Sequence, residues 1–343
     1  MGRILYATHE RFLEHDAGAW HPERAERLEV VRHALSHFED AVTIVTPTPA
    51  PRAAIEAVHT PAHVEALERY CLMGGGPIDP DTSVNDASFE AAQLAAGAGL
   101  DAIERLRQGE ADAAFLAVRP PGHHATVDQA MGFCLLNNVA IAAQALIDQG
   151  ERVLILDIDA HHGNGTAAIF EREPRVLYVS THQYPLFPGT GRIGDVGDGP
   201  GVGTTINLPL PPQTSGQTAR ALLETIALPA ITTFGPTWAI VSAGYDAHRD
   251  DPLTELDFRA PDYAPLIAIA RDAVPPGRLI LALEGGYDLE ALEHSTLVTF
   301  ATLLHAAVDV GEAPSRDVDH ELVTTLQRLH RAALERGLAN ERG

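Results

Sequence analysis

Short apolar runs recur along the chain, separated by longer stretches in which apolar positions follow a helical period. The runs predict strands at 3–7, 113–118, 152–158, 175–180, 204–210, 237–243 and 278–283. The stretches between them predict helices near 22–37, 88–107, 134–149, 216–232, 262–273 and 288–308. Alternation of this kind is typical of an α/β fold in which a parallel sheet carries helices on both faces.

No low-complexity linker or internal repeat interrupts this alternation, so the pattern predicts a single domain over residues 1–343. We expect its catalytic core at about 3–308 and an amphipathic packing helix at about 316–337. The chain is expected to end in a frayed polar stub at 340–343.

Polar side chains follow five of the predicted strands at the point where each strand ends. They are found at 119–124, 180–182 and 284–287, and at His161 and Asp246. In open parallel α/β sheets, ligands bind just beyond the carboxyl ends of the strands. We therefore expect one functional site at this edge of the sheet.

A cluster of metal-ligand side chains lies in the stretch DIDAHHGNGT, residues 157–166. Asp157, Asp159 and His161 alternate along a predicted strand, so we expect all three on one face. The glycines of HHGNG are expected to end this strand in a turn. Carboxylates and an imidazole at the end of an apolar strand are costly to desolvate, and a divalent metal ion offsets that cost.

Zinc in a catalytic site takes three protein ligands and keeps one position open for water or substrate. Asp159, His161 and Asp246 provide an O, N, O set, with Asp246 arriving from the end of another strand. Asp157 lies deeper on the same face and is better placed to orient a histidine than to bind the metal.

Groups for proton transfer and oxyanion stabilisation occur after two other strands. His123 and His124 lie in the rigid turn RPPGHHA, where one imidazole serves as general base and acid and the other as an electrostatic stabiliser. Gly285 precedes Tyr287 in EGGYDLE and lets the backbone approach a ligand, while the phenol donates a hydrogen bond to an oxyanion. Together with metal-activated water, these groups predict an amide-hydrolysis site.

Composition adds information about partners. Forty-seven acidic residues face 24 basic residues, all of them arginine, which gives a net charge of −23. This charge argues against direct binding of nucleic acids and favours cationic partners, although GC-rich codons and a saline cytoplasm would also produce it. No apolar run approaches the roughly 20 residues of a membrane span. The N-terminus lacks the pattern of a secretory signal, so we expect a cytoplasmic protein.

The chain resembles the zinc-dependent histone deacetylase family, which includes acetylpolyamine amidohydrolases and acetoin-utilisation proteins. The resemblance covers essentially residues 3–308, and HPERAERL at 21–28 is similar to the class II branch. It implies a single arginase-like domain around an eight-stranded parallel sheet. The motifs that carry it occur in the family's order: RPPGHHA, GFCLLNN, DIDAHHGNGT, FPGTG, SAGYDAHRDDPL and EGGYDL.

The resemblance also implies roles for individual residues. The zinc ligands, which in some members hold Fe²⁺ instead, are Asp159, His161 and Asp246. The other catalytic residues are His124 as general base and acid, His123 beside it, Asp157 orienting His123, Asn164 facing His124, and Tyr287 on the oxyanion. A structural K⁺ or Na⁺ is implied at Asp157 and the Ser180 hydroxyl, with backbone oxygens of Asp159, His161 and Thr181. A second monovalent site is implied near Phe170, Glu173 and Val176.

Substrate residues are implied by the same motifs. Phe133, next to Gly132, and Phe187 resemble the two aromatic walls of an acyl-lysine tunnel. Leu253 corresponds to a position at the tunnel mouth where polyamine-selective members carry glutamate, which favours acetylated lysine in a peptide or protein. Asp250 and Asp251 would instead offer charge to an acetylated polyamine.

Two further points are open from the sequence. Asp79 or Asp81 is a candidate for holding the substrate backbone. A third hypothesis is a dimanganese ureohydrolase of the arginase type, because DAHRD at 246–250 matches a ligand pattern of those enzymes. Gly163 stands where the second metal would need an aspartate, so we treat this match as coincidental. The oligomeric state is not predicted.

Overall fold

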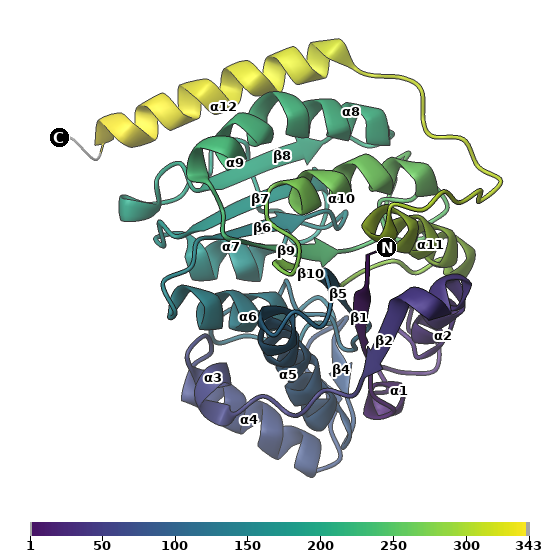
Figure 1. Ribbon diagram of the computed structural model, residues 1–343. Coiled ribbons are helices and arrows are strands. Elements are labelled where there is room, and N and C mark those ends of the chain that lie inside the picture. Colours follow the sequence, from purple (N-terminus) through teal and green to yellow (C-terminus); the bar gives the residue numbers. More distant parts are fainter. Residues whose placement is uncertain (1, 341–343) are drawn as a thin grey trace.

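The computed structural model describes residues 2–340 and is built around an eight-stranded sheet in which all neighbours pair in parallel (Figure 1). The strands lie in the order β2, β1, β5, β10, β9, β6, β7, β8. Their bounds are Ile4–Ala7 (β1), Val42–Val45 (β2), Ala113–Leu116 (β5), Val153–Asp157 (β6), Val176–Gln183 (β7), Thr205–Leu210 (β8), Trp238–Ala243 (β9) and Leu279–Leu283 (β10). A separate antiparallel pair joins β3 (Gly76–Pro77) to β4 (Ser83–Val84).

The predicted strands are all present, and β2 is the strand of this sheet that the sequence pattern did not predict. β2 lies at the edge of the sheet, and its middle residues are exposed, including Ile44 at 58%. A short edge strand with solvent-facing residues lacks the continuous apolar run that marks a strand buried on both faces. The eight-stranded parallel sheet implied by the family resemblance is confirmed.

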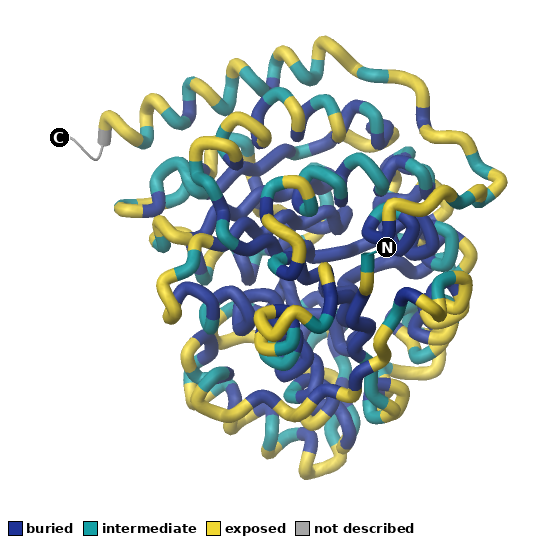
Figure 2. Tube along the Cα trace, in the orientation of Figure 1, coloured by how far each residue is buried: buried dark blue, intermediate teal, exposed yellow. Residues whose placement is uncertain are grey.

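Helices cover both faces of the sheet. The central strands β6, β9 and β10 are therefore buried along their whole length (Figure 2). The helices are α1 (Arg11–Glu14), α2 (Glu26–Leu35), α3 (Arg52–Glu56), α4 (Pro61–Leu72), α5 (Ser88–Arg107), α6 (Asn138–Ile147), α7 (Asn164–Phe170), α8 (Gly216–Leu222), α9 (Leu228–Phe234), α10 (Tyr263–Asp272), α11 (Leu289–Leu304) and α12 (His320–Asn340). None of these helices has the length and apolar character needed to cross a membrane.

Most predicted helices are found, with some changes at their ends. α5 occupies the predicted residues, and a π-helical turn at Leu223–Ala227 joins α8 to α9 within the helix predicted at 216–232. The predicted packing helix is α12, which lies against α8. It begins at His320 rather than near 316. Of the predicted polar end, residues 341–343 lie outside the described part of the chain.

The prediction that one strand carries three alternating metal-site residues was wrong in its extent. β6 ends at Asp157, so Asp159 and His161 lie in the loop that follows. Gly163 and Gly165 do not form a simple turn, because Gly163 caps α7 and Gly165 lies within it. The structure therefore presents the three side chains from a strand end and a loop, which allows them to converge without a shared strand face.

The strand order brings the predicted polar clusters together. The five strands that precede them, β5, β10, β9, β6 and β7, are consecutive neighbours in the sheet. Asp157 pairs in register with Ser180 of β7 on one side and with Ser242 of β9 on the other. The loops after these strands consequently meet at one edge.

Candidate active site

Asp159, His161 and Asp246 converge on one point beyond β6 and β9. One donor atom from each lies within 4.8 Å of the other two, and all three residues are buried. His161 Nδ1 is 2.8 Å from Asp246 Oδ2 and 3.2 Å from Asp159 Oδ1. Two carboxylates and one imidazole are donors that suit a divalent metal such as zinc.

Glycines make room for this cluster. A Cβ atom on Gly244 would lie 2.1 Å from Asp159 Oδ2, and a Cβ on Gly285 would lie 2.4 Å from Asp246 Oδ2. Backbone amides of Gly285 and Ala160 donate to Asp159 and Asp246 at 2.8 and 2.7 Å, which orients both carboxylates. The residues therefore fit the metal that the sequence predicted.

The pKa shifts within the cluster also indicate that it binds a cation. Burial lowers the pKa of His161, but the Asp246 and Asp159 carboxylates outweigh it and raise this pKa to about 10. Burial and the neighbouring Asp159 raise the pKa of Asp246 to about 6. Buried carboxylates at this spacing need positive charge between them, and a divalent ion supplies more of it than one proton.

The histidine pair lies beside the metal cluster, and its members have opposite electrostatic environments. His123 Nδ1 is 3.1 Å from Asp157 Oδ2. Although burial opposes it, the negative charge of Asp157, Asp159 and Glu284 raises the pKa of His123 well above its ordinary value. These carboxylates favour the protonated form of His123, and Asp157 lies within hydrogen-bonding distance of its ring.

His124 is held in the neutral form. Its burial and the positive charge of His123 and His161 lower its pKa well below the ordinary value. Asn164 Oδ1 lies 2.8 Å from His124 Nδ1. An amide oxygen only accepts, so Nδ1 donates to it and Nε2 carries the free lone pair. His124 thus has the protonation state of a general base.

The loop that carries Tyr287 is fastened by two acidic side chains. Asp251 Oδ2 accepts a hydrogen bond from the Tyr287 backbone amide at 2.7 Å. Glu284 Oε2 accepts from the backbone amides of Gly122 and His123 at 2.7 and 3.2 Å. Glu284 therefore connects the tyrosine loop directly to the histidine loop.

Two aromatic side chains lie beside the tyrosine and the histidine of the site. The centres of the Phe133 and Tyr287 rings are 5.7 Å apart, and those of the Phe187 and His124 rings are 5.1 Å apart. Both pairs pack edge to face. Gly132 lies between His124 and Phe187, since its Cβ would lie 2.5 Å from the imidazole and 3.0 Å from the Phe187 ring. The structure brings the predicted wall residues next to Tyr287 and His124.

The acidic residues expected to contact substrate at the tunnel mouth differ in exposure and in the hydrogen bonds they already form. Asp251 is buried, and its two carboxylate oxygens accept hydrogen bonds from the backbone amides of Tyr287 and Leu253. Its predicted role toward a polyamine was therefore wrong. The Asp250 side chain is 61% exposed. Asp79 Oδ1 accepts hydrogen bonds from the backbone amides of Asp81 and Thr82. These bonds shape the loop that contains all three residues.

The DAHRD stretch does not form a second set of metal ligands. His248 accepts at Nδ1 from the Asp250 amide at 3.2 Å, and its Nε2 lies 3.3 Å from Glu312. It therefore faces the linker before α12 rather than the cluster. A side chain at Gly163 would lie 2.2 Å from Asp157 Oδ2, which leaves no room for a second aspartate.

The residues of the first predicted monovalent site lie together. Asp157 and Ser180 are register partners, and Thr181 follows Ser180 on β7. The buried Thr181 Oγ1 has no hydrogen-bond partner among residues 2–340. At the second predicted site, the Phe170 and Glu173 carbonyls accept from the amides of Glu173 and Val176 at 3.0 and 3.3 Å. Both sites stay predictions.

The contacts of three site residues were not predicted. Glu284 lay beside the GGY motif, and Asp251 lay in a motif already noted, but neither sequence position shows which backbone amides these carboxylates bind. Tyr178 lies within β7 and donates to Asp157 at 3.0 Å. Its place in an apolar strand gave no sign of this contact.

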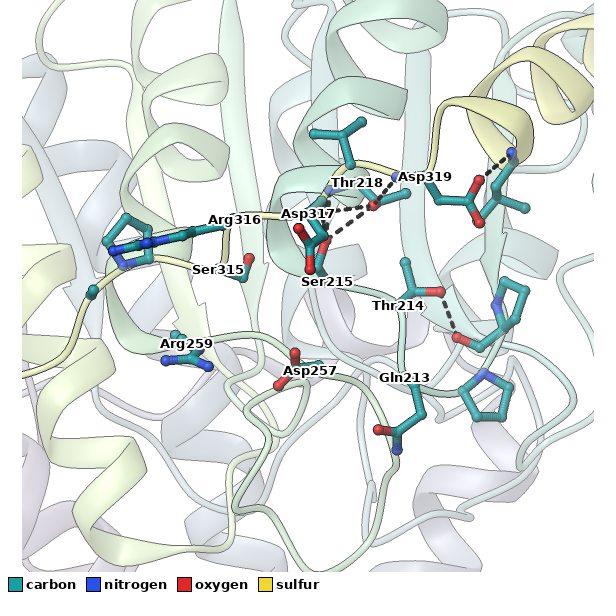
Figure 3. Close-up of a pocket in the computed structure, with 16 residues that line it drawn as sticks. Gln213, Thr214, Ser215, Thr218, Asp257, Arg259, Ser315, Arg316, Asp317 and Asp319 are labelled. Carbon is teal, nitrogen blue, oxygen red and sulfur yellow. Dashed lines mark hydrogen bonds between the residues drawn. The ribbon is translucent and has the colours of Figure 1, made fainter.

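A cavity of about 580 Å³ lies elsewhere, between the segments 211–215, 257–259 and 313–319 (Figure 3). None of the candidate site residues lines it. The hydroxyl of Ser215 donates to the carbonyl of Asp317, which fastens the linker that leads into α12. This cavity is therefore associated with docking of the C-terminal segment.

Comparison with known proteins gives concordant results. Residues 21–303 match the family described as "Histone deacetylase domain". A probable deacetylase from Archaeoglobus fulgidus is 41% identical over 305 residues, covering 86% of this chain and 84% of that protein. A histone deacetylase-like amidohydrolase from Pseudomonas aeruginosa is 36% identical over 279 residues, covering 79% of this chain and 73% of that protein. The crystal structure of the HDA15 HD domain is similar with a TM-score of 0.87 and 32% identity, covering 98% of this chain and 99% of that chain.

Proposed function

Because this chain belongs to the histone deacetylase family and is therefore a hydrolase of amide bonds, we propose that it removes acetyl or related acyl groups from the ε-amine of lysine in peptides or proteins. The observation that carries the proposal is the convergence of three metal-ligand side chains with His124 and Tyr287, each of which has a phenylalanine ring beside it. The resemblance seen in the sequence is confirmed at the level of the family.

Each residue has a distinct task in the proposed reaction. A divalent ion at Asp159, His161 and Asp246 would polarise the amide carbonyl and lower the pKa of water. His124 takes a proton at Nε2 from the attacking water and delivers it to the leaving amine. The cationic His123 stabilises developing negative charge, and the Tyr287 hydroxyl donates a hydrogen bond to the oxyanion.

The cofactor part of the proposal is zinc, with Fe²⁺ as the alternative metal for the same ligands. The donor set and the room left by Gly244 and Gly285 support a single divalent ion. For K⁺ or Na⁺, the support is the parallel register of β6 and β7, which pairs Asp157 with Ser180, so their side chains share one face of the sheet.

Lysine is favoured over an acetylated polyamine as the amine half of the substrate. Phe133 and Phe187 suit a thin aliphatic stem. Asp251 is turned to backbone amides, so Asp250 alone is left of the acidic pair that would attract a distal ammonium group. Leu253 adds no charge at the position where polyamine-selective members carry glutamate.

The test is a comparison of kcat/KM for an acetyl-lysine peptide and for N-acetylputrescine, using enzyme reconstituted with zinc. We expect the peptide to be preferred by about tenfold or more, and Leu253→Glu to shift the ratio toward N-acetylputrescine. A wild-type preference for N-acetylputrescine would make the acetylated polyamine the substrate. Absence of hydrolysis of either compound by metal-loaded enzyme would exclude acetyl as the acyl group and direct the test to lysine peptides that carry other acyl groups.

A further inference from the structure

Glu23 is a buried carboxylate held between two buried arginines. Glu23, Arg27 and Arg119 are each no more than 1% exposed. Arg119 donates to Glu23 through Nε at 2.5 Å and through Nη2 at 2.8 Å, and Arg27 Nη1 donates at 3.1 Å. Burial alone would raise the pKa of Glu23, but the two guanidinium groups hold it at about 2. The carboxylate is therefore charged at neutral pH.

Arg27 continues this contact to the tyrosine loop. Its Nε donates to the Gly286 carbonyl at 2.7 Å and its Nη2 to the Glu284 carbonyl at 2.5 Å. Its guanidinium carbon lies 5.1 Å from the centre of the Tyr287 ring. Arg27 therefore contacts both the Tyr287 ring and the backbone that precedes it, and Glu23 forms an ion pair with Arg27.

Arg119 continues the contact in the other direction, to the histidine loop. It is the residue that opens the stretch RPPGHHA and lies four positions before His123. Its Nη1 also donates to the Phe12 carbonyl at 2.7 Å. Arg119 is thereby fixed at the point where β5 gives way to the loop that carries both histidines.

We propose that Glu23 is a positioning residue: by pairing with Arg27 and Arg119 together, it sets the placement of the Tyr287 hydroxyl relative to His124. Base and oxyanion donor must address the same amide group, and small errors in such a geometry lower the rate strongly. Glu284 links the same two loops directly, but it reaches only backbone amides on the histidine side. The proposal rests on the proposed roles of His124 and Tyr287.

The first test is Glu23→Gln, which keeps the side chain's shape and removes its charge. The new amide N–H faces arginine donors and cannot accept from them. We expect kcat to fall by about tenfold while KM stays within about twofold and bound zinc is unchanged.

Asp262→Asn is the matched control. Asp262 is also fully buried, and it accepts from the Arg259 and Ser315 amides and from Gln217, none of which lies in either catalytic loop. It loses the same charge, so we expect lower stability with kcat near the wild-type value. An equal loss of kcat in Asp262→Asn would attribute the effect of Glu23→Gln to general destabilisation and overturn the proposal.

A double-mutant cycle with Tyr287→Phe tests the route through the tyrosine. If Glu23 acts by placing the Tyr287 hydroxyl, Glu23→Gln should lower kcat by less than about twofold once that hydroxyl is absent. Equal losses in both backgrounds would overturn the inference and leave the proposed function intact. Wild-type turnover by Tyr287→Phe alone would instead reject the proposed mechanism. Should Glu23→Gln not fold, Glu23→Asp, which keeps the charge and withdraws the carboxylate, enters the same cycle with the same criteria.

Discussion

At the scale of single residues, the chemistry depends on small side chains as much as on the groups that react. The sequence predicted Asp159, His161 and Asp246, and the structure brings them together. It also shows that Gly244 and Gly285 keep the space around the carboxylates clear. Gly285 was expected to approach a ligand, whereas Gly244 lies in the motif SAGYD without any local feature that marks its contact with Asp159.

Gly244→Ala should weaken metal binding. Its methyl group would lie 2.1 Å from Asp159 Oδ2 and would displace that carboxylate. We expect zinc affinity to fall by about tenfold or more, as for other changes that reorient a ligand. The measurement is zinc content by mass spectrometry after dialysis at a series of buffered free-zinc concentrations.

Gly194→Ala is the control for this change, because no atom of residues 2–340 other than those of Gly194 and its two chain neighbours lies within 4 Å of the added methyl group. It should retain wild-type affinity. Equal zinc affinity in Gly244→Ala and the wild type would show that the Asp159 carboxylate tolerates the methyl group, contrary to the steric argument.

At the scale of elements, the site depends on which strands are neighbours and on how the following helices begin. α6 starts at Asn138, with Asn137 as its N-cap. Asn137 Oδ1 accepts from the Ala140 amide at 2.9 Å, and its Nδ2 donates to the Ala125 carbonyl and to Thr166 Oγ1, both at 3.1 Å. A helix cap therefore also joins the end of the histidine loop to α7. The sequence pattern placed the start of this helix near 134 and did not identify the cap.

Asn137→Ala should destabilise the fold by roughly 2–4 kcal/mol, because it removes a cap and two further hydrogen bonds to buried groups, the Ala125 carbonyl and the Thr166 hydroxyl. Thr60→Ala is the comparison: Thr60 caps α4 by accepting from the His63 amide at 3.3 Å, and its loss should cost about 1 kcal/mol. Urea unfolding of both variants measures the difference. Equal losses would mean that Asn137 acts as an ordinary cap.

At the scale of the whole molecule, buried histidines make stability depend on pH. Burial first, and then the neighbouring His63, lowers the pKa of His59 to about 4 from 6.5. His59 Nδ1 lies 2.8 Å from the Thr126 carbonyl, and Nε2 accepts from the Asn137 amide at 2.9 Å. Protonation of Nε2 would break the second bond. His15 is similarly buried, with a pKa of about 4.

The contribution of His59 and His15 to stability should therefore fall as the pH decreases from 6.5 to about 4. In this interval the unfolded chain binds a proton at each histidine and the folded chain does not, so acid favours unfolding by as much as roughly 3 kcal/mol per group. Urea unfolding at pH 7 and pH 4.5 measures the loss.

His59→Gln should show a smaller loss between these two pH values than the wild type, whereas His33→Gln, at an exposed position on α2, should show the same loss. Exposed acids repel one another less in this interval, and the buried Asp251 and Glu284, whose pKa values burial raises to about 7, take up protons in the folded state. Both contributions oppose that of the histidines and are common to all three proteins. An unchanged pH dependence in His59→Gln would exclude His59 as a source.

The sequence by itself determined the alternation of strands and helices, the acidic character of the chain, and the identities of the predicted metal ligands, histidines and tyrosine. These follow from local period and residue type, which neighbours in sequence set. The edge strand β2, the strand order and the partners of Glu23, Glu284 and Asp251 were decided only by the tertiary structure. Glu23 and Arg119 are 96 positions apart, and Glu284 and Gly122 are 162 apart. Such contacts depend on which strands lie side by side, and no local pattern of residues encodes that order.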